Sequence, residues 1–252
     1  MSLSEYSTLR PFVARLTTRS ILSSAEQDDI LDLPCRVTQL RPNEDFLGIG
    51  EHSDHASFVA HGLVGRFDQN GRGDRQITAL HISGDMPDLH SVVQPKATSA
   101  LQALCSSTVV KIPHSALRAL AAKKPAIAEA FWRDSVVDAM ILAQWVVNVG
   151  RRDAKSRIAH LFCEMACRYK IEPEDGIVAY DLPMTQAQMA DATGLTPVHV
   201  NRTLRQLSEI GTTFRRGRIR IKDWDTLVEI GDFDRTYLQE EPGPGRPLRL
   251  AS

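Results

Sequence analysis

The segment from Pro125 to about Val149 constrains the fold of this chain more strongly than any other feature. It contains no glycine, and Pro125 suits the first turn of a helix, so the segment predicts one uninterrupted helix of about seven turns. Its apolar residues lie on several faces of that helix. Such a helix needs more than one packing partner, so we expect one face to contact the rest of the chain and another to contact a second copy.

A two-fold dimer through this helix is therefore expected. The alternative is a central helix that is buried within a monomer, but the chain has few other long helices that could surround it. The residues expected at the dimer contact are Trp132, Val136, Ala139, Met140, Ala143 and Val147.

The part of the chain before this helix is rich in short strands. Residues 35–112 contain β-rich runs separated by turn signals, which predicts an antiparallel β-roll. Asn70-Gly71 indicates a hairpin, because both central residues of a type I′ turn need positive φ. Residues 4–32 are expected to be helical in pieces, with Ser24 as an N-cap. The expected fold class is therefore α+β.

The composition is that of an ordinary soluble globular protein, with 42% apolar and 24% charged residues in a chain of 252. The N-terminus shows no signal-peptide pattern, and the most apolar segment is too short to span a bilayer. Four cysteines in a chain of this length do not form a disulfide framework. We therefore expect a cytoplasmic protein without a membrane partner.

Residues 185–207 have the pattern of two short helices joined by a glycine turn. Thr185 can cap the first helix, with Gln188 completing a capping box, and Gly194 can supply the turn. Thr196 can cap the second helix. This order predicts a helix-turn-helix, in which the second helix enters the major groove of DNA.

A basic hairpin follows the two helices. Residues 211–224 alternate apolar residues with arginines around Gly217, which predicts a two-stranded wing with a basic tip. Between Thr196 and Lys222 there are seven Lys and Arg against one acid, although the whole chain has a net charge of −1. A solvated charged face would usually contain more acids, so this local charge favours double-stranded DNA as the partner.

These segments resemble one family. MTQAQMADATGLTPVHVNRTLRQLSE, followed by RGRIRIKDW, closely resembles the helix-turn-helix and wing of the Crp–Fnr family of bacterial transcription regulators. GEHSDHASFVAHGLVGRF and ITALHISGDMPDL resemble that family's cyclic-nucleotide-binding β-roll, and NVGRRDAKSRIAHLF resembles the end of its dimerisation helix. The resemblance implies a homodimeric regulator that binds a near-palindromic DNA site and recruits or blocks RNA polymerase.

The chain departs from the members of this family that bind cyclic AMP. Those members carry a Gly-Glu pair and a later Arg-Ser pair around the cyclic phosphate. The matching stretch here, GDMPDLHSVVQPKATSAL, lacks the Gly-Glu pair and has Ala97 at the arginine position. Lys96 is nearby but lacks the fork geometry of a guanidinium. Cyclic AMP is therefore not expected to bind in the usual way.

A second departure concerns the oxygen-sensing members, which hold an iron–sulfur cluster with cysteines near the N-terminus. The first cysteine here is Cys35, and Cys105 stands alone, so no such cluster is expected. We predict no cofactor. An unknown small-molecule effector in the roll is one alternative, and a regulator without a ligand, controlled by its abundance, is the other.

The resemblance also assigns the residues that face DNA. Many relatives carry Glu, then Ser or Gly, then Arg, where this chain has Val198, Asn201 and Arg202. Val198 cannot accept a hydrogen bond from cytosine as Glu would, so we expect a different target site. The residues expected at base edges are Val198, His199, Asn201 and Arg202. Those expected at phosphates are Thr196, Thr203, Arg205, Arg215, Arg216 and Arg218.

The rival hypothesis is a small-molecule-binding or metal-dependent roll enzyme with an appended domain. None of the three candidate groups has the further ligand or the nucleophile and base that such chemistry needs, so we expect no enzyme activity and no metal. The groups are His160 with Cys163 and Cys167, His52 with His55 and His61, and Asp85 with Asp88.

The expected organisation has four parts. Residues 1–124 form the β-roll with its N-terminal helices, and residues 125–150 form the dimerisation helix. Residues 151–240 form a winged-helix DNA-binding domain. Residues 241–252 are rich in proline and glycine and are expected to be a disordered tail.

Overall fold

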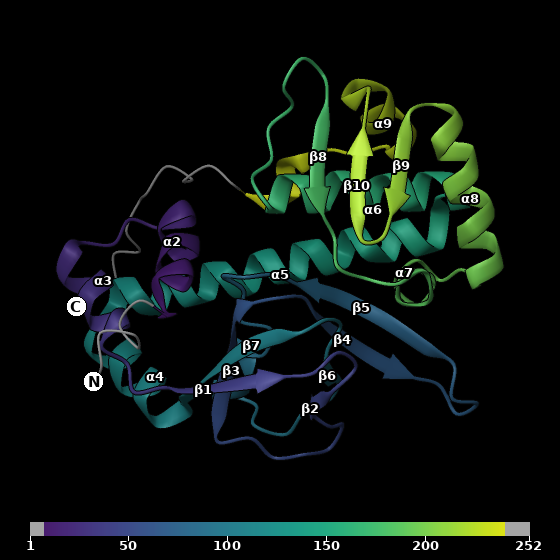
Figure 1. Ribbon diagram of the computed structural model, residues 1–252. Helices are drawn as coiled ribbons and strands as arrows, with labels where there is room; N and C mark the ends of the chain where they lie inside the picture. Colours follow the sequence, from purple (N-terminus) through teal and green to yellow (C-terminus); the bar gives the residue numbers. More distant parts are fainter. Residues whose placement is uncertain (1–7, 240–252) are drawn as a thin grey trace.

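The computed structural model describes residues 8–239, and its elements are arranged around one long helix, α5 (Pro125–Arg151). Figure 1 shows the strands of the N-terminal half on one side of α5 and the C-terminal unit on the other. The predicted helix is confirmed, and it runs two residues further than Val149. The tail expected at residues 241–252 lies outside the described residues.

The N-terminal half is a β-roll made of two antiparallel sheets, as predicted. One sheet has the strand order β1-β7-β3 and the other has the order β2-β6-β4-β5. The strands are β1 (Arg36–Leu40), β2 (Asp45–Leu47), β3 (His55–His61), β4 (Val64–Gln69), β5 (Arg75–His81), β6 (Ala100–Ala103) and β7 (Ser107–Pro113).

The β4–β5 hairpin is present, but the turn predicted for it is wrong. Gln69 pairs with Arg75, so the loop has five residues rather than two. The side chain of Asn70 accepts hydrogen bonds from the backbone N–H groups of Arg72 and Asp74. This side-chain bonding stabilises a wider loop than the type I′ turn that Asn-Gly suggests.

Short helices flank the roll: α2 (Arg10–Arg19), α3 (Ser24–Leu31), the 3-10 helix η1 (Leu89–Val92) and α4 (His114–Lys123). The sequence predicts Ser24 as the N-cap of α3, but the N-cap is Ser23. Ser23 and Glu26 form a reciprocal capping box, so the glutamate three residues on selects the earlier of the two serines.

The C-terminal unit packs helices behind a small sheet. The three strands have the order β8-β10-β9, so the predicted two-stranded wing gains a third strand. The elements are α6 (Ala154–Arg168), β8 (Val178–Asp181), α7 (Gln186–Thr193), α8 (Pro197–Glu209), β9 (Thr212–Arg215), β10 (Arg218–Ile221), α9 (Trp224–Gly231) and η2 (Arg235–Leu238).

Helix α5 buries one face within the chain and exposes another apolar face. Val137, Ile141 and Trp145 are buried. Trp132 and Val136, by contrast, are 63% and 51% exposed. The exposed face, called the apolar stripe below, comprises Trp132, Val136, Ala139, Ala143, Val146 and Val147. Met140 is half-buried at its edge.

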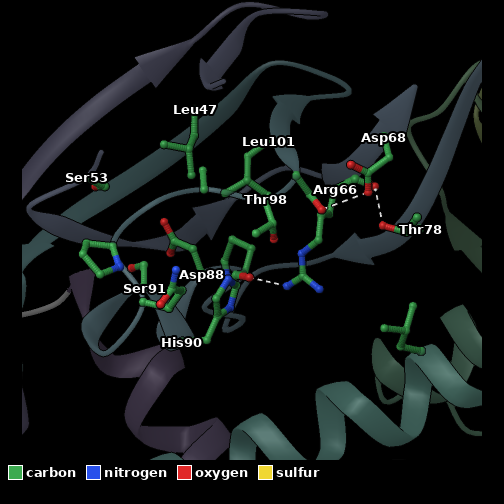
Figure 2. A pocket seen from close by; sticks show the side chains of 16 residues that line it. Leu47, Ser53, Arg66, Asp68, Thr78, Asp88, His90, Ser91, Thr98 and Leu101 are labelled. Atoms are coloured by element: carbon green, nitrogen blue, oxygen red, sulfur yellow. Dashed lines mark hydrogen bonds between the residues drawn. The ribbon is translucent and has the colours of Figure 1, made fainter. Parts of the chain in front are cut away.

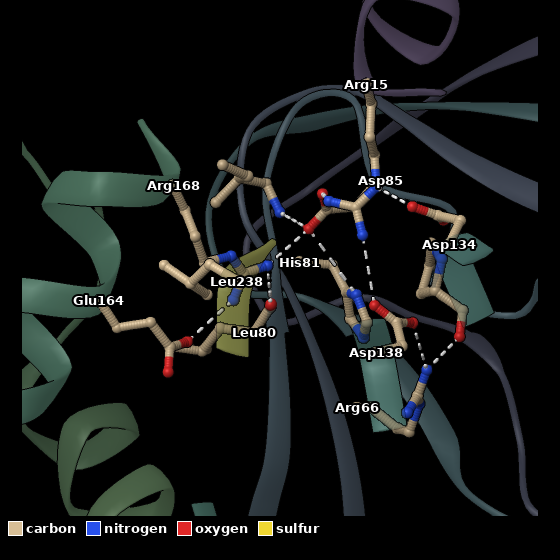
Figure 3. Close-up of polar contacts among 12 residues, drawn as sticks. Arg15, Arg66, Leu80, His81, Asp85, Asp134, Asp138, Glu164, Arg168 and Leu238 are labelled. Atoms are coloured by element: carbon tan, nitrogen blue, oxygen red, sulfur yellow. Dashed lines mark hydrogen bonds and ion pairs between the residues drawn. The ribbon is translucent and has the colours of Figure 1, made fainter. Parts of the chain in front are cut away.

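A buried ion-pair cluster joins the N-terminal helices, the roll and the C-terminal unit (Figure 3). Its centre is Asp85, in the turn after β5, which is 1% exposed. The Asp85 carboxylate accepts hydrogen bonds from Arg15 of α2 and, at 2.7 Å, from Arg168 of α6. It also accepts from the backbone N–H of Ile82, a bond that closes the turn after β5. Arg15 continues the cluster to Asp134 of α5 at 2.6 Å.

Replacing Asp85 with alanine is expected to lower the free energy of unfolding by about 3–5 kcal/mol, because two buried guanidinium groups lose a partner. Urea unfolding measures this change. Asp54→Ala is the matched control: its side chain is fully exposed and, within residues 8–239, pairs with His55 alone, so stability should hardly change. Equal stability of the two variants would contradict a structural role for the cluster.

Candidate nucleic-acid interface

The helix-turn-helix forms as the local sequence predicts. The Thr185 hydroxyl accepts from the backbone N–H of Gln188, and the Gln188 side chain accepts from the backbone N–H of Thr185 at 2.8 Å. Gly194 ends α7 with a φ of 64°, the left-handed conformation that glycine adopts without strain. The Thr196 hydroxyl accepts from the backbone N–H of His199 and begins α8. These local contacts set where α7 begins and ends and where α8 begins.

Helix α8 presents all four residues predicted for base contact on its exposed side. Val198 is 78% exposed, and His199, Asn201 and Arg202 are exposed as well. The opposite face of α8 is held in the core of the C-terminal unit by Val200, Leu204 and Leu207. One face of α8 is therefore held in the core, and the opposite face exposes a row of polar and apolar side chains.

The phosphate contact predicted for Thr203 is wrong. Thr203 is 1% exposed. It lies three residues after Val200 and four before Leu207, so it shares their buried face. Its hydroxyl cannot reach DNA from that position. The other predicted phosphate residues on this helix and its cap, Thr196 and Arg205, are exposed.

The wing carries its arginines at a tight turn. Arg215 pairs with Arg218, which leaves Arg216 and Gly217 as the two turn residues, with φ values of 52° and 77°. Positive φ at both positions is the requirement of a type I′ hairpin turn. The three predicted arginines, Arg215, Arg216 and Arg218, are all exposed.

The wing tip lies beside the entry to α7. The carbonyl of Gly217 accepts a 2.7 Å hydrogen bond from the backbone N–H of Leu182, three residues before the N-cap of α7. Arg218 lies 3.8 Å from the carboxylate of Asp181, and both side chains are largely exposed. Such an exposed pair neutralises little charge. The wing therefore remains cationic.

Gln186, which was not predicted from the sequence, contacts one of the residues predicted for base contact. Its side-chain oxygen accepts from the amide nitrogen of Asn201 at 3.4 Å. Gln186 begins α7, and the crossing of α7 over α8 brings these residues together across fifteen positions in sequence. Gln186 can therefore orient the Asn201 amide.

Helix α7 also contacts the β-roll of its own chain, which the sequence did not predict. Gln188 donates to the carbonyl of Leu104 and to the Asn43 side chain, each at 3.0 Å. Gln76 of β5 donates to the carbonyl of Ala192 at 3.1 Å. These bonds place the edge of the roll against α7, whereas the reading face of α8 is exposed.

The roll contains a cavity of about 260 Å3, shown in Figure 2. Arg66, Asp68, Asp88 and Leu142 are among the residues that line it. Ala97, at the position where cyclic-AMP-binding proteins have arginine, also lines the cavity. Lys96 is exposed and is not among the lining residues, so the cavity receives no cation from this segment.

The other candidate groups are engaged in structural contacts. His160 is buried, and its ring contacts the Gly231 carbonyl and the Tyr237 hydroxyl, each at 3.2 Å. Asp88 accepts from the backbone N–H of Ser57. Within residues 8–239, no group of three or more His, Cys, Asp or Glu is arranged to hold a metal ion. Among the helices of these residues, none combines the length and the hydropathy that a membrane-spanning segment needs.

Comparisons with known proteins match both halves of the chain. Residues 37–124 match a family model described as a cyclic nucleotide-binding domain. Residues 156–230 match one described as a Crp-like helix-turn-helix domain. The two matches leave α5 between them, so they agree with a roll and a DNA-binding unit joined by the long helix.

Relatives align over most of the chain. It is 22% identical to the anaerobic regulatory protein of Haemophilus influenzae over 229 residues, which cover 90% of this chain and 88% of that protein. It is 26% identical over 170 residues to the nitrogen fixation regulation protein FixK of Azorhizobium caulinodans, covering 68% of each. The solved structure of FixK2 from Bradyrhizobium japonicum is similar at a TM-score of 0.71 and 26% identity, covering 79% of this chain and 98% of that one.

Proposed function

Because the chain belongs to the Crp–Fnr family of transcription regulators, we propose that it acts as a homodimer on a near-palindromic DNA site. The observation that carries the proposal is the exposure of a complete reading face on α8 beside an exposed basic wing. A helix in the major groove with a wing on the backbone gives both base readout and phosphate contacts.

The reading face has a distinct chemistry at each position. Arg202 can donate two hydrogen bonds to guanine, and Asn201 can pair with adenine. Val198 can contact the methyl group of thymine but cannot accept from cytosine. His199 lies between Val198 and Asn201 in sequence and is exposed as well. The proposed target therefore differs from that of relatives with Glu at the valine position.

The proposed phosphate contacts exclude Thr203, because it is buried. They comprise Thr196, Arg205, Arg215, Arg216 and Arg218. These residues carry no sequence information themselves, but they fix the position of α8 on the duplex.

The apolar stripe of α5 supports the dimer. Its valine and tryptophan side chains that are more than half exposed would leave water if a second copy covered them, and this burial lowers the free energy of the dimer. Trp132, Val136, Ala139, Ala143 and Val146 recur at alternating spacings of four and three, the pattern of a helix pair that packs along a seam. A two-fold axis through this seam would place two α8 helices on a palindrome.

The proposal includes neither cyclic AMP nor an iron–sulfur cluster. In the cavity, Ala97 provides no guanidinium for a cyclic phosphate. Cys163 and Cys167 are buried on α6, while Cys35 lies among the N-terminal core residues, far from them in sequence.

Recruitment or blocking of RNA polymerase in the cytoplasm is proposed from family membership. The rival proposal of a roll enzyme has less support, because the named relatives are regulators.

Arg202→Ala and Arg216→Ala should weaken DNA binding in different ways. Arg202→Ala should make the free energy of binding to the preferred site less favourable by about 1–3 kcal/mol and should weaken the base preference at one position of that site. The second should weaken all duplexes alike and reduce the slope of log K against log salt by about one. Fluorescence anisotropy across a salt series separates the two effects. Arg36→Ala, an exposed arginine on β1, is the control and should bind as the parent does. Loss of specificity with Arg216→Ala but not with Arg202→Ala would contradict the assignment.

Val136→Glu should break the dimer, because each copy would bury a carboxylate without a partner. We expect the dimer dissociation constant to rise at least roughly a hundredfold, equivalent to about 2.7 kcal/mol. Sedimentation velocity over a concentration series measures it. Val93→Glu, at a valine that is 81% exposed outside the apolar stripe, should remain dimeric. A fully dimeric Val136→Glu variant would refute the proposed interface.

A further inference from the structure

A second cavity, of about 280 Å3, lies where α2, the turn after β5, the C-terminal end of α6 and η2 meet. It shares no lining residue with the roll cavity. Asp85 is the only acid in its described lining, and Figure 3 shows Arg15 and Arg168 reaching that carboxylate from different directions. The cations that line it come from α2 and from the end of α6: Arg15, Arg19, Arg168 and Lys170.

The arginines of this cavity share their acids instead of having one each. Asp85 accepts hydrogen bonds from both Arg15 and Arg168. One oxygen of Asp134 accepts from Arg15 at 2.6 Å and from Arg19 at 2.8 Å. Burial, together with the charge of Arg15, lowers the pKa of Arg19. Arginine stays protonated in proteins, so Arg19 is a cation held in a region of surplus positive charge.

The remaining acids of the cluster do not line the cavity. Asp138 lies 3.3 Å from Arg15, and Glu164 lies 3.1 Å from Arg168. Neither these two nor Asp134 is among the lining residues. They stabilise the guanidinium groups from elsewhere, so a molecule in the cavity would meet four cations and one carboxylate that is already shared.

Lys170 adds a charge that the fold itself does not use. The residue is exposed, and within residues 8–239 its ammonium group forms no ion pair. It ends α6 with a φ of 57°, a position where glycine is the usual residue. Tyr169 beside it is half-buried and also lines the cavity, and its hydroxyl is open to solvent. Both side chains are therefore available to a ligand.

We propose that this cavity binds a phosphate group, carried either by free phosphate or by a small phosphomonoester. The cations lie on two sides, on α2 and at the end of α6. A tetrahedral anion presents oxygens to both sides, whereas a planar carboxylate presents its two oxygens to one. The volume of about 280 Å3 leaves room for a small organic group beside the phosphate. The proposal does not rest on DNA binding, because no residue of α8 or of the wing lines the cavity.

The site lies at the junction between the N-terminal helices and the C-terminal unit. A phosphate there would contact Arg19 of α2 and Lys170 after α6 at once, beside the carboxylate that already joins these elements. Binding should therefore stabilise the contact between them and raise the midpoint of thermal unfolding.

Titration calorimetry of the full chain at constant ionic strength tests the proposal. The probes are inorganic phosphate, D-ribose 5-phosphate, D-ribose and succinate. We expect saturable binding of at least one phosphate probe, no binding of D-ribose, and at least about tenfold weaker binding of succinate. Tighter binding of the ester than of inorganic phosphate would identify a phosphomonoester as the ligand, and the reverse order would identify free phosphate.

Two variants locate the phosphate. Lys170→Gln should weaken its binding at least about threefold, and this exposed position carries little risk to folding. Arg19→Gln should weaken it at least about tenfold, and urea unfolding shows whether that variant is folded. Lys123→Gln is the control: it removes the same charge from an exposed lysine on α4 outside the cavity, and it should bind as the parent does.

Four results would overturn the proposal. They are equal binding of D-ribose and D-ribose 5-phosphate, tighter binding of succinate than of both phosphate probes, parent-like phosphate binding by Lys170→Gln, and no binding of either phosphate probe at millimolar concentration. The second and third would place the bound anion at another basic surface or assign the cavity to carboxylates. DNA binding is measured separately on the protein without probe, so failure of one proposal leaves the other standing.

Discussion

The carboxylate of Asp85 joins parts of the chain that are far apart in sequence. Its two arginine partners, Arg15 and Arg168, are 70 and 83 residues away and belong to the N-terminal helices and the C-terminal unit. All three side chains are largely buried. The C-terminal unit cannot leave the roll without separating Arg168 from Asp85, which would leave buried charges unpaired. The position of the recognition helix relative to the roll therefore depends on this cluster.

Helix α5 contacts the roll cavity, the proposed dimer seam and the DNA-binding unit. Leu142 lines the roll cavity, and Val146 belongs to the apolar stripe one turn later. Trp145, between them, donates a 3.0 Å hydrogen bond to the buried Glu164 of α6, which in turn pairs with Arg168. A small rotation of α5 would therefore change the cavity, the dimer seam and the first helix of the DNA-binding unit together. A ligand can favour one of two positions of α5 only if it makes different contacts with the protein in each position.

Features that depend on neighbouring residues could be predicted from the sequence, whereas those that depend on distant residues could not. The caps at Thr185 and Thr196 follow from side chains that bond three residues ahead. The polar side chain of Thr203 predicts an exposed residue, but its position on α8 places it in the core. The cluster at Asp85 and the bond from Gln188 to the roll join segments about 70 or more residues apart, and no local pattern indicates them. The cavity, likewise, needed the folded roll to become visible.

Selection of binding sites from random duplex DNA shows whether two copies of α8 read an inverted repeat. We expect enrichment of an inverted repeat whose two half-sites are spaced by about one helical turn, because two α8 helices related by a two-fold axis would read it. The enriched half-site should differ from that of relatives with Glu at the position of Val198. Enrichment of a single unrepeated element, or no enrichment at low salt, would contradict a dimer that reads DNA through two copies of α8.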